Sequence, residues 1–293
     1  EGANGCLAFT YVEKDRKNFC AGATATKSVF CFDNRIIHIG TGITNKSQYP
    51  TETTIYQLRL EDKDAEVDIN DEYSGTFPYS YRHKENSPVV LTDVNGNSYI
   101  IRNGNGLVVE KKHQSSPSDT KKKTGEGDFV TAYIDHGASP KEASYEYMML
   151  VRPSGKEVGK YVKKLPYTVL QADNDAHVVN DAATGITAYV SYRGYSSDKT
   201  LTAEIQPETI VMERKKEDGT VVMSVCTPDL GITKKGYTTS QPSQPLLKEV
   251  VLNGKYALSE ENNAVTVDEK DGRTRLSVTC INGQPVEFRL KKQ

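Results

Sequence analysis

The sequence predicts an all-β protein built from two antiparallel β-sandwich lobes. Apolar, β-branched and aromatic residues recur with a period of two along most of the chain. Gly, Asn, Asp and Pro separate these runs at short intervals. Helical periodicity is convincing nowhere, and at most one turn is expected around Val158–Lys164. Many short strands without alternating helices favour sandwiches over a parallel α/β sheet.

The expected strands are runs of four to ten residues with alternating side chains. In the first lobe they are Cys6–Glu13, Lys27–Asp33, Arg35–Ile43, Thr53–Leu60, Val89–Asp93, Ser98–Arg102, Leu107–Lys112, Phe129–Asp135 and Tyr145–Val151. In the second lobe they are Tyr167–Gln171, His177–Asn180, Thr187–Tyr192, Thr209–Arg214, Thr220–Cys226, Ala264–Asp268, Arg273–Cys280 and Pro285–Leu290.

Three dipeptides between expected strands predict tight hairpins. They are Asn95-Gly96, Asp218-Gly219 and Asp271-Gly272. Gly tolerates a positive φ angle without cost, and Asn and Asp tolerate it better than most residues. We therefore expect two-residue type I′ turns at these positions.

A change of composition near residues 154–166 predicts a boundary between the lobes. Ser154-Gly155 opens this segment, a lysine-rich stretch follows, and Pro166 closes it. We expect a sandwich over 1–153, a linker over 154–166 and a smaller C-terminal sandwich over 167–293. The chain of 293 residues is long enough for two such cores.

Composition limits the classes of partner. The formal net charge is only −2, so the whole chain does not attract nucleic acid or other polyanions. No apolar stretch approaches the length of a membrane span. The five cysteines include no CxxC pair, so neither a zinc site nor a catalytic thiol is expected. We predict no nucleic-acid or membrane partner and no metal site.

One lysine cluster is a candidate binding surface. Lys121, Lys122 and Lys123 follow the basic run Lys111–His113 by one polar loop. Clustered lysines give a local positive potential even on a nearly neutral protein, and such a patch suits a sulfated or carboxylated glycan. A solvated loop without a ligand is the competing interpretation.

Three charged residues inside strand-rich sequence form a second candidate group. Asp33, Arg35 and Glu52 are expected to be solvent-facing or paired. If they are internal, Arg35 pairs with Glu52 or with Asp33. We favour a structural ion pair over a catalytic role.

Two further motifs have a functional and a structural interpretation. Asp135-His136 could supply a general base, but its position before Gly137 favours a turn that ends a strand. The segment Asp93–Asn97 has oxygen-bearing side chains at alternate positions, as in a calcium loop. A later acidic ligand is absent at the expected spacing, so a hairpin turn is favoured.

Five blocks of sequence, taken in order, carry a family resemblance. They are Lys27–Ile43 (KSVFCFDNRIIHIGTGI), Thr51–Thr54 (TETT), Ile134–Gly137 (IDHG) with Tyr145–Tyr147 (YEY), Tyr167–Leu170 (YTVL) with His177, and Thr227–Leu230 (TPDL). Together they resemble the β domains of polysaccharide lyase family 8, the chondroitin and hyaluronan lyases. Within that family the match looks closest to chondroitin sulfate ABC lyases.

The resemblance implies a fold and a reaction. The fold is part of the lyase super-sandwich, incomplete at its N-terminal side, followed by a smaller sandwich. The family cleaves at uronic acids by β-elimination, with a His, a Tyr and an Arg from an α/α toroid and, in chondroitin lyases, a Glu early in the β domain. All of these groups are expected upstream of the matched blocks. No catalytic residue is therefore assigned here, and the chain alone is expected to be inactive.

The resemblance also implies partners and a location. They are chondroitin sulfate, dermatan sulfate or hyaluronan, together with the upstream toroid, in the periplasm or outside a bacterial cell. No cofactor is required, although a divalent cation such as calcium is compatible with the family. A free-standing carbohydrate-binding or structural β-sandwich is the alternative.

Overall fold

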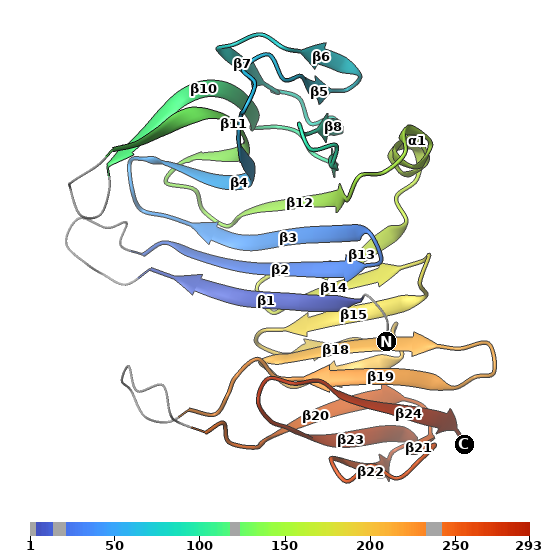
Figure 1. Cartoon of the computed structure of the whole chain (residues 1–293). Helices are drawn as coiled ribbons and strands as arrows, with labels where there is room; N and C mark the ends of the chain where they lie inside the picture. The colour runs from blue at the N-terminus through green and yellow to red at the C-terminus, as the bar shows by residue number, and fades with distance from the viewer. Residues whose placement is uncertain (1–3, 14–21, 118–123, 233–241) are drawn as a thin grey trace. The chain divides into compact units, whose positions relative to one another are not determined.

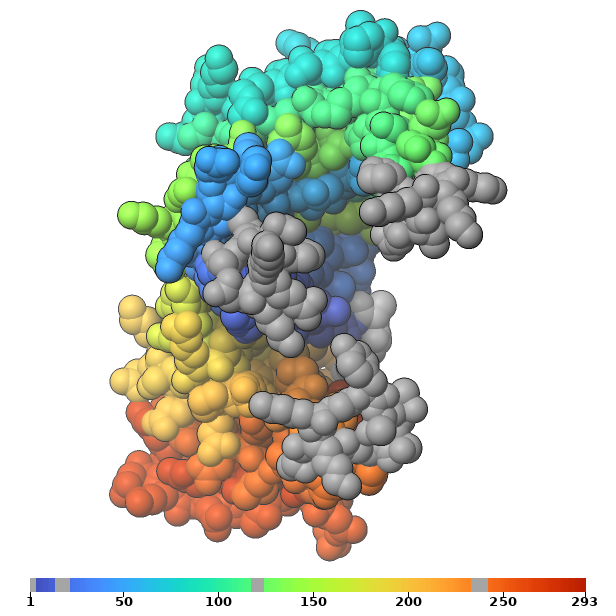
Figure 2. All heavy atoms as spheres, turned by 90° about the vertical axis from the view of Figure 1, so that its left-hand side faces the viewer, coloured from blue at the N-terminus to red at the C-terminus, as the bar shows by residue number. Residues whose placement is uncertain are grey.

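The chain is almost entirely β-structure in the computed structural model, which describes residues 4–13, 22–117, 124–232 and 242–293. These residues carry the colours of Figure 1 and of the space-filling view in Figure 2. The chain divides into two compact units. Unit 1 contains Phe9–Leu165, and unit 2 contains Pro166–Gln293 together with Asn4–Ala8. The predicted all-β fold is confirmed.

Apart from the first half of β1, whose residues up to Ala8 group with unit 2, unit 1 is built from an eight-stranded sheet and a four-stranded sheet, both with antiparallel pairing (Figure 1). The larger sheet has the order β1 (Gly5–Val12), β2 (Thr24–Phe32), β3 (Arg35–Thr44), β12 (Ala143–Leu150), β9 (Ser98–Ile101), β8 (Val89–Thr92), β5 (Val67–Ile69) and β6 (Glu72–Ser74). The smaller sheet has the order β4 (Pro50–Arg59), β11 (Thr124–Ala138), β10 (Leu107–Pro117) and β7 (Tyr79–Arg82).

The core of unit 1 lies between these two sheets. It collects alternate residues from both, including Leu91, Ile101 and Tyr147 from the larger sheet and Val109 and Val130 from the smaller one. The period of two in the sequence therefore arises because successive side chains point in turn to this core and to the outer face.

A single helix, α1 (Gly155–Lys163), follows β12 among the described residues and occupies the segment expected to be a linker. Ser154 is its N-cap, and its Oγ accepts a hydrogen bond from the N–H of Glu157 at 3.2 Å. Ser154 and Glu157 have the spacing of a capping box, which is the local signal for a helix start. Tyr161 is the buried anchor of this helix.

Unit 2 is likewise formed by two antiparallel sheets. The seven-stranded sheet has the order β13 (Tyr167–Ala172), β14 (Ala176–Asp181), β15 (Ile186–Ser191), β18 (Thr209–Lys215), β19 (Val221–Cys226), β24 (Val286–Lys292) and β21 (Tyr256–Leu258). The five-stranded sheet has the order β16 (Tyr195–Ser196), β17 (Thr202–Ile205), β20 (Leu246–Asn253), β23 (Arg273–Cys280) and β22 (Val265–Lys270).

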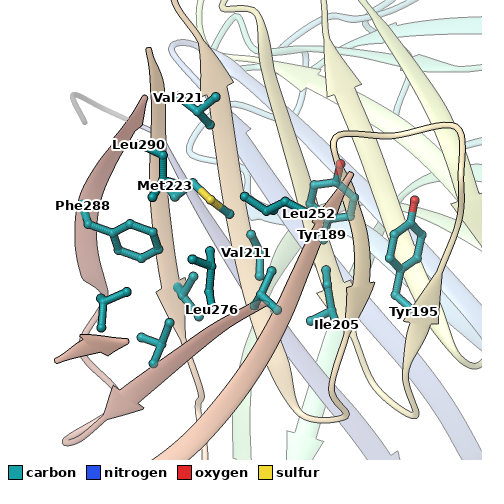
Figure 3. Packing of buried hydrophobic residues seen from close by; sticks show 14 of the residues in the cluster. Tyr189, Tyr195, Ile205, Val211, Val221, Met223, Leu252, Leu276, Phe288 and Leu290 are labelled. Atoms are coloured by element: carbon teal, nitrogen blue, oxygen red, sulfur yellow. The ribbon is translucent and has the colours of Figure 1, made fainter. Parts of the chain in front are cut away.

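The core of unit 2 is rich in Val, Leu and Tyr. Figure 3 shows Tyr189 and Tyr195 side by side toward one end of this cluster and Phe288 toward the other, with Leu276 and Met223 between them. The rings of the two tyrosines meet edge to face, with centroids 5.2 Å apart. Edge-to-face contact is a favoured geometry for aromatic pairs.

The three expected hairpins form, but only one has the predicted turn. At Asp271-Gly272 both residues take positive φ angles, 55° and 75°, as a type I′ turn requires. At Asn95-Gly96 and Asp218-Gly219 only the glycine does, with φ 81° in each case. In both, the N–H of the Gly bonds the carbonyl three residues earlier, so these are three-residue loops that end in a Gly bulge.

Candidate functional site

Arg35 and Asp33 lie together at the turn that joins β2 to β3. Arg35 Nη2 is 3.5 Å from Asp33 Oδ2, with Arg35 buried and Asp33 exposed. Asp33 has a positive φ angle of 53° in this tight turn. Glu52 does not share this position, because it lies in β4 of the other sheet opposite Asp135. Of the two partners considered for Arg35, the structure places Asp33 beside it.

The outer face of the four-stranded sheet carries a continuous group of polar side chains. Strand register places them on one side, opposite the buried residues Val109, Val130 and Ala132. We call this group the polar sheet face, and its members are Glu52, Gln57, Arg82, Glu110, Lys112, Gln114, Thr131, Tyr133 and Asp135.

The charges of the polar sheet face neutralise one another. Arg82 Nη1 lies 3.0 Å from Asp135 Oδ2, and Lys112 Nζ lies 2.5 Å from Glu110 Oε2. Glu52 has no such direct contact among the ion pairs of the described residues. Its pKa is raised by burial and then by the carboxylates of Asp135 and Glu110. With three carboxylates and two cations, this face therefore offers polar contacts with no excess positive charge.

A chain of neutral groups crosses three strands of the same face. Gln57 Nε2 donates to Gln114 Oε1 at 2.8 Å, and Gln114 Nε2 donates to Thr131 Oγ1 at 3.1 Å. Tyr133 lies in the same strand as Thr131 and is half-buried. Amides and hydroxyls both donate and accept hydrogen bonds, which suits a ligand rich in hydroxyl groups.

His136 and Asp135 point in different directions and do not form an acid–base pair. Asp135 accepts from the N–H of Gly137 at 2.8 Å and pairs with Arg82. His136 Nε2 lies 2.9 Å from Thr53 Oγ1 on the side facing the larger sheet. The pKa of His136 is lowered by burial and by the nearby Lys27 ammonium, so the neutral ring is favoured. Both residues lie inside β11, where the sequence predicted a turn that ends the strand.

Stacked rings lie next to His136. The Tyr145 and His136 centroids are 6.4 Å apart, Tyr145 and Tyr147 are 5.9 Å apart, and His38 stacks on Tyr147 at 4.5 Å. Lys27 Nζ is 5.7 Å from the centre of the Tyr145 ring. Burial raises the pKa of Tyr145 to about 12 and lowers that of His38 to about 4. These rings pack against one another, and with pKa values so far from neutrality Tyr145 and His38 are poorly suited to proton transfer at neutral pH.

The basic run ahead of the lysine cluster does not form an open positive patch. Lys111 is fully buried, with Nζ donating to the carbonyls of Ala65 at 2.8 Å and Gly75 at 3.0 Å. Lys112 pairs with Glu110, and His113 Nδ1 lies 2.9 Å from Asp128 Oδ1. Strand alternation in the sequence indicates that Lys111 is buried, because side chains two residues apart point to the same face and Leu107 and Val109 are core residues. Lys121, Lys122 and Lys123 lie outside the described residues.

Asp93 organises a hairpin through four hydrogen bonds. Its Oδ1 accepts from the N–H groups of Asn95 and Asn97, and its Oδ2 accepts from Asn97 Nδ2 and the Tyr99 hydroxyl, all within 3.0 Å. Both carboxylate oxygens thus serve the turn, which is the geometry that the hairpin interpretation expects. Within the described ranges, no three His, Cys, Asp or Glu side chains gather as metal ligands. No helix in those ranges has the length and apolar character of a membrane span.

Comparison with known protein families identifies unit 1. Residues 1–162 match the model of polysaccharide lyase family 8, super-sandwich domain. The chain is 30% identical over 297 residues to the chondroitin sulfate ABC endolyase of Proteus vulgaris, covering 99% of this chain and 28% of the relative. It is 29% identical to the chondroitin sulfate ABC exolyase of Bacteroides thetaiotaomicron, covering 99% of this chain and 29% of the relative. The chain thus spans less than a third of either relative.

Solved structures share the fold at lower identity. Paenibacillus xanthan lyase superposes with a TM-score of 0.77 at 18% identity, covering 99% of this chain and 28% of that one. Streptomyces coelicolor chondroitin AC lyase in complex with chondroitin sulphate superposes with a TM-score of 0.70 at 18% identity, covering all of this chain (100%) and 36% of that one. At this identity the likeness establishes the fold.

Proposed function

Because this chain belongs to polysaccharide lyase family 8, we propose that it is the C-terminal β-sandwich portion of a glycosaminoglycan lyase. In this proposal the parent enzyme cleaves chondroitin sulfate, dermatan sulfate or hyaluronan by β-elimination at uronic acid, in the periplasm or outside the cell. The β-sandwich portion supports the catalytic toroid and lines the glycan cleft. The supporting observation is coverage: nearly all of this chain (99%) aligns with only 28% of a chondroitin sulfate ABC endolyase.

The chemistry of the described residues supports a non-catalytic role. The elimination needs a base for the C5 proton, an acid for the leaving oxygen and a group that neutralises the uronate carboxylate. On the polar sheet face, Arg82 and Lys112 are already paired with carboxylates, and the nearby His136 is bonded to Thr53. This face can hydrogen-bond a glycan through Tyr133, Gln57 and Gln114, but it assembles no such trio.

The lysine cluster completes the proposed glycan contact. Lys121, Lys122 and Lys123 follow β10, whose outer side chains belong to the polar sheet face. We assign the charge attraction for a polyanion to these lysines, because the polar sheet face itself is nearly neutral. The proposal thus separates long-range attraction by the lysines from short-range hydrogen bonding by the sheet.

Near-ultraviolet absorbance tests the proposal, because β-elimination creates an unsaturated product that absorbs there. The purified chain is incubated with chondroitin sulfate, alone and after addition of a separately expressed family-8 toroid. We expect no product from the chain alone and product growth above that of the toroid alone when both are present. Steady product growth from the chain alone, abolished by His136→Ala or Tyr145→Phe, would overturn the non-catalytic assignment. Unchanged toroid activity, with glycan binding by the chain, would favour a free-standing binding protein.

A further inference from the structure

Unit 2 contains a hollow of about 540 Å³ that has no part in the proposed lyase function. It lies on the outer face of the five-stranded sheet, where Glu204 pairs across strands with Val251, and Val251 with Arg275. The adjacent residues Val250 and Leu252 point the other way, into the core. The volume is within the roughly 300–1,000 Å³ typical of small-molecule sites.

The floor of the hollow alternates hydrogen-bond donors and acceptors around one apolar residue. Arg275 Nη1 bonds Glu249 Oε2 at 2.9 Å, and Val251, two residues after Glu249 in β20, lies opposite Arg275. Arg273, two residues before Arg275 in β23, places its Nη1 3.2 Å from Glu204 Oε1. Each guanidinium has five N–H donors and each carboxylate accepts several bonds, so these pairs keep capacity for a ligand.

The rim adds further polar groups from neighbouring segments. Gln206 Oε1 accepts from the backbone N–H of Glu249 at 3.1 Å. The side-chain NH₂ group of Gln206 is therefore the donor that it offers to the hollow. Arg193 and Asp175 also line the hollow, with 3.9 Å between Nη1 and Oδ1. The N–H groups of Tyr192 and Arg193 both bond the carbonyl of Asp175, which anchors this part of the rim.

The balance of charges selects the class of ligand. Each carboxylate that lines the hollow faces a guanidinium, Asp175 with Arg193, Glu249 with Arg275 and Glu204 with Arg273, so the site has no excess positive charge. A sulfated or carboxylated sugar would meet these carboxylates without an unpaired cation to balance its own charge, which is unfavourable. Vicinal hydroxyls of an uncharged sugar can donate to a carboxylate and accept from a guanidinium or an amide.

We propose that this hollow on unit 2 binds a short neutral saccharide. The site is distinct from the proposed glycosaminoglycan contact in unit 1, both in its residues and in the charge of its ligand. It would give a lyase of this family a second carbohydrate contact whose affinity does not depend on salt, because no counterions are released when an uncharged ligand binds.

Calorimetry on the full chain tests the proposal with named probes. The neutral probes are N,N′-diacetylchitobiose, lactose and cellobiose, and the anionic probe is a sulfated chondroitin disaccharide. The double variant Glu249→Ala/Arg275→Ala removes both members of the floor ion pair, so neither charge is left unpaired. The matched control, Lys255→Ala/Glu269→Ala, removes a surface ion pair that does not line the hollow.

We expect at least one neutral disaccharide to bind the parent, equally at low and high salt. The double variant should weaken that binding by about tenfold or more, since several polar contacts are lost, and the control should not. If the double variant also melts earlier than the control, Arg193→Ala on the exposed rim is measured instead. The proposal is overturned if none of the neutral probes binds, if the variants bind as the parent does, or if the sulfated disaccharide binds more tightly.

Discussion

Gly40 in β3 lies directly opposite Tyr145 in β12, and the tyrosine ring occupies the space that a side chain at Gly40 would need. A Cβ atom at residue 40 would lie 2.2 Å from Cε1 of Tyr145. The backbone of Gly40 has no positive φ angle, so its role is close approach rather than an unusual turn. This pair brings together two of the sequence blocks that carry the family resemblance.

Replacing Gly40 by Ala should destabilise unit 1 by about 1–3 kcal/mol, the usual cost of overpacking a core. The measurement is urea unfolding followed by circular dichroism. Gly159→Ala is the matched control, because residue 159 lies inside α1 with open space around it. That control should raise stability by about 0.5–1 kcal/mol, the difference in helix propensity. Equal effects of the two substitutions would contradict the contact with Tyr145.

Lys111→Met should destabilise the protein by about 2–4 kcal/mol, because two buried carbonyls lose their donor. These are the carbonyls of Ala65 and Gly75. Lys112→Met is the control on the adjacent residue. Its half-exposed ion pair with Glu110 should contribute less than about 1 kcal/mol. Thermal unfolding compares the two variants, and a larger effect at Lys112 would count against the buried position of Lys111.

The buried carboxyl of Glu213 should make the stability of unit 2 depend on pH. Burial raises its pKa above the ordinary value, although Tyr189 and Thr202 donate to its two oxygens at 2.6 Å and 2.5 Å. Below the unfolded-state pKa the group is neutral in both states. As pH rises from that value through the folded pKa, ionisation is penalised only in the folded state, so stability falls over this window.

Glu213→Gln should remove this part of the pH dependence and leave unit 2 at least as stable as the parent at pH 7. Glu213→Ala should instead cost about 2–4 kcal/mol, since it leaves two hydroxyls unpaired and opens a cavity. Hydrogen exchange of the β18 amides, measured from acid to neutral pH, follows unit 2 by itself. A parallel pH profile for the parent and Glu213→Gln would refute the assignment.

Arg35→Ala should lower the melting temperature, with a loss of about 1–3 kcal/mol from packing and from the ion pair. Asp33→Asn should have a much smaller effect, because Asp33 is 61% exposed and Asn also tolerates a positive φ angle. An unchanged melting temperature for Arg35→Ala, with lost activity when the toroid is added, would reveal a functional residue instead.

The lysine cluster should bind chondroitin sulfate weakly and with strong salt dependence. Replacing Lys121, Lys122 and Lys123 together by Ala should abolish most of the affinity at low salt, because the counterion-driven attraction disappears. Lys255→Ala/Glu269→Ala again serves as the control, since it leaves the net charge unchanged. Equal affinities for the triple variant and the parent at low ionic strength would assign the attraction to other residues.

The sequence predicted the elements that alternate cleanly and missed those that do not. Strand Leu246–Asn253 was overlooked because its apolar residues, at 246, 247, 250, 251 and 252, fit helical spacing as well as strand spacing. The short strands Val67–Ile69 and Glu72–Ser74 lie within an acidic stretch, where three residues are too few to show an alternation of apolar and polar side chains. Helix α1 is too short for a clear helical period, and its local signal is the capping box formed by Ser154 and Glu157.

The candidate site was less predictable than the fold. The pairing of Arg35 with Asp33 follows from a short turn and is readable locally. The polar sheet face is not, because Gln57 and Gln114 meet only once strands far apart in sequence are in register. The hollow of unit 2 likewise depends on the meeting of β17, β20 and β23, which no local pattern specifies.

The position of β12 within its sheet has a consequence for biosynthesis. This strand lies between β3 and β9 and pairs with both, although it is the last strand of unit 1 to be made. An emerging chain can form the β2–β3 hairpin early, yet the sheet stays in two halves until residues 143–150 leave the ribosome. Pairings over so long a sequence separation close slowly. Nascent unit 1 therefore exposes apolar strand faces for most of its synthesis, and chaperones that bind such faces should recognise it until β12 arrives.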